Sequence, residues 1–474
     1  MSSQMLNTRR TKIIATLGPA TSDADMVAKM VAAGVNICRI NMSHAVPDQV
    51  RKTVETIRYV SDLLKKPVGI LMDLQGPAIR TGDLPTALNL QPGNRIGLTV
   101  RGEVSEEEHS VDVNYDHLVD DIKVGDVVLV DNGEIHLKVL SKKRNQLSCE
   151  VLTEGTLGSR RHINLPGVRV KLPALTDKDI HDVELGIELG VDFIAMSFCR
   201  EAEDVLKLKA ILDYRKARQK VVAKLEDQEG IRNVEDIIEV ADAVMVARGD
   251  LGIECPYEEL PIIQRRVVKD CVMAGRPVIV ATHMLESMID NPSPTRAEIT
   301  DVSNAVFEQC DAIMLSGETS VGKYPLKCLE IMDRIASRVE RSGGANYAMQ
   351  ASMDTKGAKM LKAATIMAEE LNASALVVFT RTGGMARNAA WLRPKHTPLY
   401  AFTDNDRLLN QLTIHWGIQP LQMPFAEDPS MNVDQAVRLL KEQGLLKSGD
   451  TIVAVTEVAV RDRLVDTIWR ESVE

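Results

Sequence analysis

The hydrophobic positions of this chain fall into short apolar runs that alternate with longer amphipathic stretches. Three runs lie near the N-terminus, at residues 12–17, 35–40 and 68–74. The stretches between them, 23–33 and 47–65, have the three- and four-residue apolar spacing of helices, with Asp or Pro near their starts. This alternation predicts parallel βα units.

The alternation stops between residues 82 and 166. Apolar runs in this segment, such as 127–130 and 135–140, are short and are separated by Gly, Asn and charged residues. No long helical period appears. The pattern predicts an inserted all-β domain, which we expect to form a β-barrel.

After residue 166 the alternation of apolar runs and helical segments resumes. The five further runs are 193–198, 221–226, 243–247, 277–282 and 312–315, and the stretch 230–240 between the second and third is expected to be a helix. With the first three they make eight βα units, a number that predicts one closed (β/α)8 TIM barrel. We therefore expect a barrel in two parts, residues 1–81 and 167–344.

A Gly-containing linker, 341–345, separates the barrel from the last part of the chain. Beyond it, apolar runs again alternate with helical stretches, which predicts an open α/β domain over residues 345–474. The expected runs are 375–380, 398–402 and 451–455, and the expected helices are 357–371 and 384–392. The fold class is thus α/β.

Composition restricts the function more than the fold. A net charge of -10 argues against nucleic acid or an anionic membrane as a partner. No apolar run approaches the roughly 18 residues of a membrane span. The run after Arg9-Arg10 stops at Gly18-Pro19, too early for an export signal, so we expect a first strand there. The 7 cysteines include no Cys-x-x-Cys pair, which indicates reduced thiols in a cytoplasmic protein and not a zinc site.

Polar side chains follow six of the eight barrel runs, at the predicted C-terminal ends of the strands. They are Arg39, Asn41, Ser43 and His44; Asp73; Lys224 and Glu226; Arg248 and Asp250; Thr282 and His283; and Glu318. Two buried ion pairs would explain the charges of the 221–252 stretch equally well. Six polar strand ends favour an active site, because this rim is where barrels carry theirs.

The residue types at the rim favour phosphoryl chemistry. Arg39 offers a planar fork of donors and Lys224 a compact positive charge. Glu226 and Asp250 are hard oxygen ligands suited to Mg²⁺. Phosphoryl transfer is catalysed mainly by positioning and charge neutralisation. No Cys/His or Ser/His pairing offers a covalent nucleophile instead.

One segment imitates a phosphate-binding loop. Residues 317–324, Gly-Glu-Thr-Ser-Val-Gly-Lys-Tyr, nearly match G-x-x-x-x-G-K-[ST], but Tyr324 replaces the hydroxyl residue that would hold Mg²⁺. The segment also follows the last barrel run instead of opening a mononucleotide fold. We interpret it as a barrel loop.

Eight motifs in order resemble those of pyruvate kinase, from the N-terminus to about residue 340 and more loosely beyond. They are Thr-Lys-Ile-Ile-Ala-Thr-Leu-Gly-Pro-Ala (11–20), Cys-Arg-Ile-Asn-Met-Ser-His (38–44), Asp-Leu-Gln-Gly-Pro-Ala-Ile-Arg (73–80), Ala-Lys-Leu-Glu (223–226), Val-Ala-Arg-Gly-Asp-Leu-Gly (246–252), Ala-Thr-His-Met-Leu-Glu-Ser-Met (281–288), Pro-Thr-Arg-Ala-Glu (294–298) and Met-Leu-Ser-Gly-Glu-Thr (314–319).

The resemblance implies Mg²⁺-dependent phosphoryl transfer from phosphoenolpyruvate to ADP, giving pyruvate and ATP, under an inserted domain that closes as a lid. The implied catalytic residues are Arg39, Lys224 and Thr282, which also bind the substrate with Gly249 and Asp250. The implied Mg²⁺ ligands are Glu226 and Asp250, the K⁺ ligands Asn41, Ser43, Asp73 and Leu74, and the nucleotide contacts Asn41, His44, Arg80 and Arg161.

Three positions depart from the family pattern. Ala78 stands where members carry Glu (potassium-dependent) or Lys (potassium-independent), so potassium dependence stays open. His283 replaces a Gln beside Thr282, and the 160–162 run, Arg-Arg-His, replaces a Lys-Lys-Gly-like run with its charge kept.

The resemblance also implies a homotetramer with an effector pocket. Thr380, Arg381, Thr382, Gly383 and Gly384 lie between a predicted strand and helix, where free N–H groups suit the phosphate of a sugar phosphate or AMP. An ordinary strand–helix turn explains this segment nearly as well. The last loop, 456–462, lacks the Gly-rich segment that helps hold fructose bisphosphate in eukaryotic members.

Two other functions are weighed against this one. A Mg²⁺-dependent aldolase or lyase acting on pyruvate enolate would share the two acids but would not need Lys224 or a lid. A metabolite sensor with a degenerate centre is disfavoured by the intact Lys224, Glu226, Asp250 and Thr282.

Overall fold

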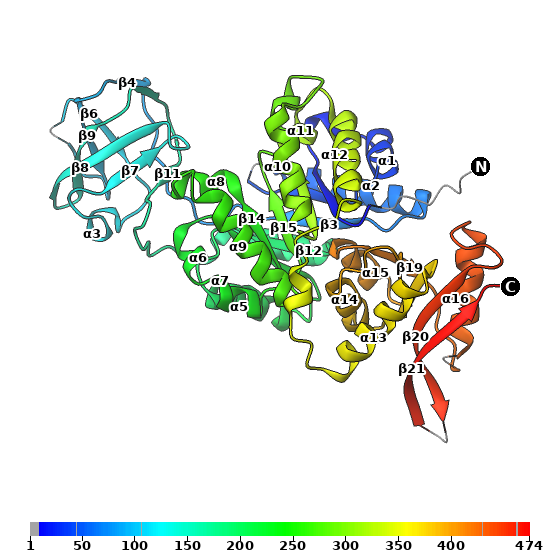
Figure 1. Ribbon diagram of the computed structural model, residues 1–474. Coiled ribbons are helices and arrows are strands. Elements are labelled where there is room, and N and C mark those ends of the chain that lie inside the picture. The colour runs from blue at the N-terminus through cyan, green and yellow to red at the C-terminus, as the bar shows by residue number, and fades with distance from the viewer. Residues whose placement is uncertain (1–8, 44, 106, 429, 461–462) are drawn as a thin grey trace.

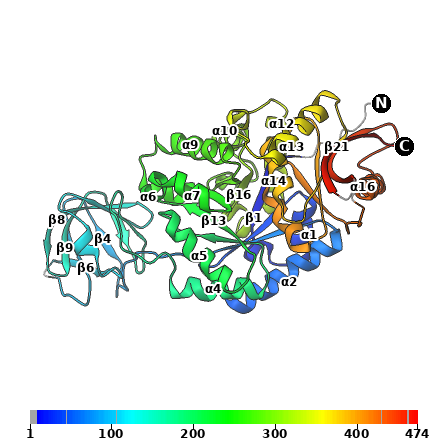
Figure 2. The same cartoon turned by 90° about the horizontal axis from the view of Figure 1, so that it is seen from below.

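A closed barrel forms the centre of the computed structural model, which describes residues 9–43, 45–105, 107–428, 430–460 and 463–474. A β domain extends from one end of the barrel, and an α/β domain packs at the other (Figures 1 and 2). The three-part architecture predicted from the alternating runs is confirmed.

Eight parallel strands close the barrel in the order β1-β16-β15-β14-β13-β12-β3-β2. Nearly every strand position is buried, because parallel barrel strands are covered on both faces. The interior is filled by side chains such as Ile14, Phe193 and Met245. Ile414 of the C-terminal domain packs in the same cluster. The strands are β1 (Lys12–Thr16), β2 (Ile37–Asn41), β3 (Gly69–Asp73), β12 (Phe193–Met196), β13 (Lys220–Leu225), β14 (Ala243–Ala247), β15 (Val278–Ala281) and β16 (Ala312–Leu315).

The barrel helices form an outer ring around these strands (Figure 2). The single helix expected over 230–240 is wrong: two short helices meet at Asn233, whose side-chain amide donates to the carbonyl of Arg200. The helices are α1 (Ala24–Ala32), α2 (Pro47–Leu64), α4 (Asp177–Glu188), α5 (Ala202–Tyr214), α6 (Gln228–Arg232), α7 (Val234–Val240), α8 (Arg248–Glu254), α9 (Leu260–Met273), α10 (Arg296–Phe307), α11 (Gly317–Ser320) and α12 (Pro325–Glu340).

The inserted domain, which we call the lid, is a curled six-stranded sheet in the order β11-β7-β8-β9-β5-β6, with a two-stranded sheet of β10 and β4. It buries its own apolar core, separate from that of the barrel. Its elements are β4 (Leu88–Leu90), β5 (Arg95–Thr99), β6 (His109–Asp112), α3 (Leu118–Asp121), β7 (Val127–Val130), β8 (Ile135–Lys143), β9 (Gln146–Val151), β10 (Gly155–Leu157) and β11 (Ile163–Asn164).

The C-terminal domain is an open sheet in the order β19-β18-β17-β20-β21, in which only β21 is antiparallel. Sequence patterning missed β19, β21, α15 and α16. Its elements are α13 (Lys356–Glu370), β17 (Ala375–Phe379), α14 (Gly384–Trp391), β18 (Leu399–Thr403), α15 (Asp406–Gln411), β19 (Ile418–Gln422), α16 (Ser430–Glu442), β20 (Thr451–Val460) and β21 (Arg463–Ser472).

A buried ion pair attaches this domain to the barrel. Both oxygens of Asp311, just before β16, accept from the guanidinium of Arg393 at 2.9 and 2.7 Å. The backbone N–H of Trp416 also donates to Asp311, at 3.0 Å. The attachment lies at the N-terminal ends of the strands, so the opposite rim faces the lid.

No helix among the described residues is long and apolar enough to cross a membrane.

Candidate active site

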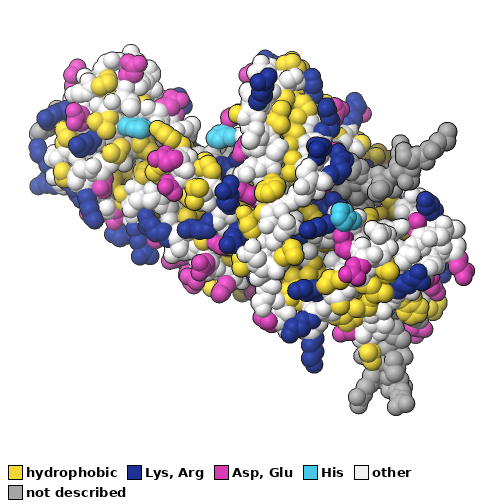
Figure 3. Space-filling model, viewed as in Figure 1, with side chains coloured by type: hydrophobic (Ala, Val, Ile, Leu, Met, Phe, Trp, Pro, Cys, Tyr) yellow, Lys and Arg dark blue, Asp and Glu magenta, His cyan; other side chains and the backbone are white. Residues whose placement is uncertain are grey.

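A cleft of about 330 Å³ lies at the C-terminal rim of the barrel, where the lid faces the strand ends. Figure 3 shows a notch between the lid and the barrel on this side of the molecule. The lid contributes Asp131, Asn132 and the 160–162 run. The barrel lining is Arg39, Asn41, Ser43, Leu74, Gln75, Ala78, Arg80, Ser197, Phe198, Lys224, Glu226 and Asp250.

Lys224 is the centre of the buried contacts in this cleft. Its Nζ lies 2.8 Å from Oε1 of Glu226 and 3.0 Å from Oδ1 of Asp73, and it donates to Oγ of Ser197 at 2.6 Å. Burial alone would lower the pKa of Lys224, but the two carboxylates outweigh burial and raise that pKa above its ordinary value. The ammonium is therefore charged at all physiological pH values.

Asp73 holds a second cation beside the first. Its Oδ2 accepts from Nε of Arg39 at 2.6 Å, and another nitrogen of Arg39 donates to Oγ1 of Thr16 at 3.0 Å. Burial would raise the pKa of Asp73, but Lys224 and Arg39 together hold it below the usual range. One buried carboxylate thus fixes two positive groups, one from β2 and one from β13, at the floor of the cleft.

Glu226 and Asp250 bring two acids to the same cleft. Oε2 of Glu226 accepts from the N–H of Phe198 at 2.6 Å. Burial raises the pKa of Glu226 to about 7, with Lys224 acting against that rise and the carboxylate of Asp250 adding to it. Asp250 lies in the first turn of α8 and makes no ion pair with any residue that the structure describes. Two carboxylates that line one cleft suit a shared divalent cation.

The donor set around these acids fits Mg²⁺. The described residues contain no group of three or more His, Cys, Asp or Glu that could hold a metal ion. Mg²⁺ is commonly bound through one or two carboxylates, with substrate phosphates and waters completing the shell. Glu226 and Asp250 supply that number.

Thr282 connects β15 to the first turn of α8. Its Oγ1 accepts from the N–H of Gly249 at 2.7 Å and donates to the carbonyl of Ala281 at 2.6 Å. Thr282 and His283 have φ values of 66° and 54°, a conformation that costs a residue with a side chain about 1–3 kcal/mol. Strain of this kind is concentrated at functional sites. Since the Gly249 N–H already donates to Thr282, a substrate carboxylate would have to compete for it.

Two polar residues of the rim serve the loops instead of the cleft. Arg248 donates to the carbonyls of Ala281 and Thr282 and pairs with Asp301. Glu318 accepts from the backbone N–H groups of Leu285 and Ser316. Both are buried and neither lines the cleft. Their position at the strand ends was predicted correctly, but their side chains do not face the cleft.

Three of the four expected K⁺ ligands, Asn41, Asp73 and Leu74, each have an oxygen that a donor of the chain already contacts. Oδ1 of Asn41 accepts from the N–H of Ser43 at 3.1 Å, and the carbonyl of Leu74 accepts from Ser197 at 2.8 Å. Asp73 is shared by Lys224 and Arg39, as described above. Ala78 lines the cleft beside this set.

The structure brings three of the four expected nucleotide contacts, Asn41, Arg80 and Arg161, to the cleft. The fourth, His44, lies outside the described residues. Arg80 donates to the carbonyl of Arg160 at 3.2 Å, and Arg161 lies 3.4 Å from Asp131. These exposed contacts leave most of the guanidinium donors free for a ligand.

Ser197 and Phe198 are cleft residues that sequence reasoning missed. They are the last two residues of the fourth predicted run, 193–198, and follow the observed strand β12; no charge marks this strand end. Phe198 adopts φ 52°, which directs its backbone N–H at Glu226. The strand-end rule already included the hydroxyl residues Ser43 and Thr282, and applying it to this strand would have identified Ser197.

The expected effector segment forms the turn between β17 and α14. Gly383 has φ 86°, a conformation that favours glycine, and its N–H donates to Oγ1 of Thr380 at 2.8 Å. Arg381 lies 3.4 Å from Asp404 and stacks on the ring of Phe425. Thr382 and Arg381 are exposed, and Gly384 begins the helix.

Comparison with known proteins agrees with this geometry. Residues 8–329 match the family described as the barrel domain of pyruvate kinase, and residues 358–468 match its alpha/beta domain. The chain is 40% identical over 467 residues to plastidial pyruvate kinase 3 of Arabidopsis thaliana, a match that covers 98% of this chain and 80% of the relative. It is 39% identical over 459 residues to the pyruvate kinase of Staphylococcus aureus strain MRSA252, covering 95% and 78%.

Proposed function

The chain belongs to the pyruvate kinase family, and we propose on this premise that its rim cleft transfers a phosphoryl group from phosphoenolpyruvate to ADP. The observation that carries the proposal is the pair of contacts that Asp73 makes with Lys224 and Arg39. These contacts hold two cations beside two acids within one cleft. Transfer of a phosphoryl group needs its oxygens neutralised and its two partners held in line. These groups do both.

Each cation has its own task in the proposal. Lys224 stabilises the charge on the phosphoryl oxygens in flight, and Arg39 holds the same group through its planar fork. Asp73 orients both, because its Oδ2 accepts from Arg39 and its Oδ1 pairs with the ammonium of Lys224. Because Lys224 and Asp73 are buried and Arg39 is largely covered, their interactions with phosphate are stronger than they would be in water.

Glu226 and Asp250 would hold the divalent cation, generally Mg²⁺ in this family. When bound, such a cation neutralises phosphoryl and carboxylate oxygens of the substrate. The raised pKa of Glu226, due to burial and to Asp250, supports this assignment because a cation would relieve that repulsion.

Thr282 and Gly249 would orient the substrate. The Thr282 hydroxyl, held by its strained backbone, lies beside the Gly249 N–H that is suited to the substrate carboxylate. We assign to this hydroxyl a part in delivering the proton that converts enolate to pyruvate.

The nucleotide would enter between the lid and the barrel. Asn41, Arg80 and Arg161 are the contacts that line this entrance, and His44 is the fourth residue assigned by family resemblance. Closing of the lid, residues 82–166, over the cleft would exclude water. The phosphoryl group would then pass to ADP and would not be hydrolysed.

Potassium dependence is proposed to be weak. Donors of the chain already contact the oxygens of Asn41, Asp73 and Leu74, and Ala78 offers neither a carboxylate nor an ammonium. We therefore expect these oxygens to bind potassium weakly.

Regulation and assembly are proposed by analogy with the family. The turn 380–384 would take the phosphate of a sugar phosphate or AMP, with exposed Arg381 as its charged group. The chain would act as a homotetramer built of the barrel (1–81, 167–344), the lid (82–166) and the C-terminal domain (345–474).

The direct test is formation of ATP from phosphoenolpyruvate and ADP, with and without Mg²⁺, K⁺ and candidate sugar phosphates. We expect Mg²⁺-dependent ATP formation with one pyruvate released per ATP. Cleavage of a C–C bond without ATP, or binding without turnover, would contradict the proposal.

A further inference from the structure

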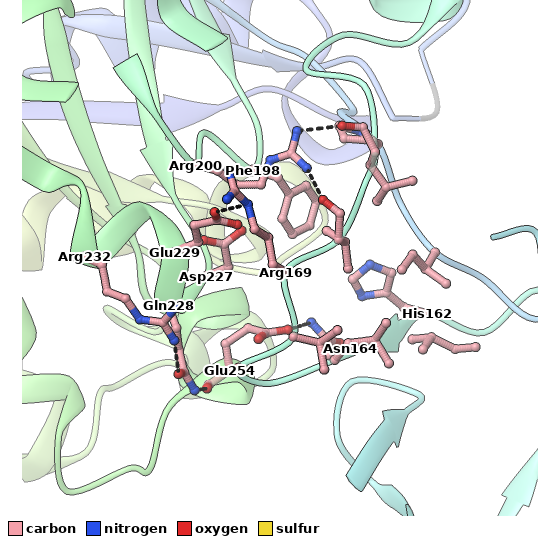
Figure 4. Close-up of a pocket in the computed structure, with 18 residues that line it drawn as sticks. His162, Asn164, Arg169, Phe198, Arg200, Asp227, Gln228, Glu229, Arg232 and Glu254 are labelled. Atoms are coloured by element: carbon pink, nitrogen blue, oxygen red, sulfur yellow. Dashed lines mark hydrogen bonds and ion pairs between the residues drawn. The ribbon is translucent and has the colours of Figure 1, made fainter. Parts of the chain in front are cut away.

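A pocket at the base of the lid lies beside the catalytic cleft and is shown in Figure 4. One wall is the chain that returns from the lid to the barrel, residues 162–172, and the other is formed by α6 and α8. The returning chain is fixed to the barrel by Arg200, which donates to the carbonyls of Val170 and Leu172 at 3.1 and 2.8 Å.

A hydrogen bond crosses this pocket from the lid to the end of α8. Nδ2 of Asn164, in β11, donates to Oε1 of Glu254 at 2.9 Å, and both residues are buried. Glu254 has no ion pair among the described contacts. Its backbone carbonyl accepts from the side chain of Gln228, at the start of α6, at 2.5 Å. Glu254 thus joins the lid, α8 and the helix that follows the Lys224 strand.

Helix α8 connects this contact to the metal ligand. It has seven residues, about 10 Å at 1.5 Å per residue, with Asp250 in its first turn and Glu254 at its end. Residues four apart lie on the same face of a helix, so Glu254 lies one turn from Asp250 on one face. A displacement of Glu254 by the lid therefore reaches Asp250 through a single rigid turn.

A second lid contact reaches the same helix. The tight turn between β7 and β8 approaches Ile253: a Cβ built on Gly133 would lie 3.2 Å from Cγ2 of Ile253. The start of α8 is held separately, through Arg248 and through the Gly249 N–H on Thr282. The helix is fixed to the barrel at its start and touched by the lid at its end.

We propose that Glu254 is a positioning residue which, through its hydrogen bond with Asn164, couples the position of the lid to the placement of Asp250 in the metal site. This inference rests on the proposed function, in which Asp250 is a metal ligand, and it deepens that function by assigning a route from lid to metal. Glu254 itself does not line the cleft.

The test exchanges the two partners of the hydrogen bond. In Asn164→Asp, a carboxyl group replaces the amide, so the N–H that residue 164 donates to Glu254 is lost. In the double variant Asn164→Asp, Glu254→Gln, the glutamine amide donates to the new aspartate and the contact is restored with its polarity reversed. Asn89→Asp, at an exposed position of lid strand β4, adds the same charge outside the lining of this pocket and is the control.

The measurement is the Kd of Mn²⁺ for the full chain by electron paramagnetic resonance, with kcat and KM for phosphoenolpyruvate. We expect Asn164→Asp to weaken Mn²⁺ binding about tenfold and raise KM more than it lowers kcat. The double variant should return both values to within about twofold of wild type, and Asn89→Asp should leave them unchanged.

Two results would overturn the proposal: unchanged Mn²⁺ binding in Asn164→Asp, or a double variant as weak as the single one. If Asn164→Asp does not fold, Asn164→Ala and Glu254→Ala give the same comparison, and either one with wild-type Mn²⁺ affinity counts against the coupling. A wild-type chain that forms no ATP would contradict the proposed function instead, while the Mn²⁺ comparison would still decide this inference.

Discussion

Lys224 and Glu226 leave strand β13 two residues apart on the same side, and their charged ends meet 2.8 Å apart in the cleft. Oε1 of Glu226 cannot hold this ammonium and a divalent cation equally well. We therefore expect cation binding to turn Lys224 away from Glu226 toward the phosphoryl group, with Asp73 still 3.0 Å from its Nζ. The Lys224–Glu226 ion pair is therefore the arrangement of the site before a cation binds.

Replacing the ammonium tests the centre of the proposed mechanism. Lys224→Met should lower kcat for ATP formation by several orders of magnitude, since charge stabilisation of this kind contributes roughly 3–4 kcal/mol or more per group. Lys220→Met is the matched control, because Lys220 lies at the other end of the same strand and pairs with Asp242. Near-normal turnover in Lys224→Met would remove Lys224 from the mechanism.

The two acids should control the metal requirement. Glu226→Gln and Asp250→Asn should each raise the Mg²⁺ concentration for half-maximal activity by at least tenfold, because each removes one of the two charged ligands. Glu318→Gln is the contrasting variant. It should lower the melting temperature, since Glu318 accepts two backbone N–H groups, but leave the Mg²⁺ requirement as in wild type. The reverse pattern would show that Glu318, not the acids of the cleft, serves the metal.

Potassium should matter little for this chain. Omitting K⁺ in favour of an inert cation should lower kcat by less than tenfold, because the expected ligands are satisfied internally. Ala78→Glu should add the missing carboxylate and create a measurable K⁺ dependence. A hundredfold loss in wild type without K⁺ would contradict the interpretation of Ala78.

Stability should depend on pH through Glu254. Burial raises the pKa of Glu254 from 4.5 to about 7, with Asn164 acting against the rise. The folded state therefore binds this proton more tightly than the unfolded state, and the group lowers stability as pH rises from about 4.5 to about 7. Glu254→Gln removes this titration. Relative to the variant, wild type should lose up to about 3 kcal/mol of unfolding free energy across that window.

Urea unfolding of both proteins at pH 5 and pH 7.5 checks this expectation. The difference between wild type and Glu254→Gln should be small at pH 5 and should favour the variant at pH 7.5. A difference that is equal at the two pH values would show that Glu254 is ionised in the folded state across the whole range.

The strands and helices of the barrel could be predicted from the sequence because barrel strands are buried on both faces, whereas the helices are buried on one face only. Apolar runs of the right length, such as 243–247, therefore marked strands directly, and their C-terminal ends marked the rim. The predicted convergence of Lys224 with Glu226 was correct for the same reason, since residues two apart in a strand share a side.

The edge of the C-terminal sheet was not readable. Strand β19 contains Pro420 and only partly buried positions after Ile418, so it lacks an apolar run. Its place in the sheet is decided by pairing with β18, a contact between distant residues. The division of helix 230–240 at Asn233 likewise depends on a bond to Arg200 in another βα unit.

What the sequence determined by itself was the order of βα units, the two interruptions of that order, and the residue types at the strand ends, because these depend on local periodicity. Only the tertiary structure decided which of those residues face the cleft. Arg248 and Glu318 turn to backbone groups, Ser197 joins Lys224, and Glu254 reaches Asn164 of the lid. The direction of a polar side chain is set by whichever partner is within reach, and that partner comes from another part of the chain.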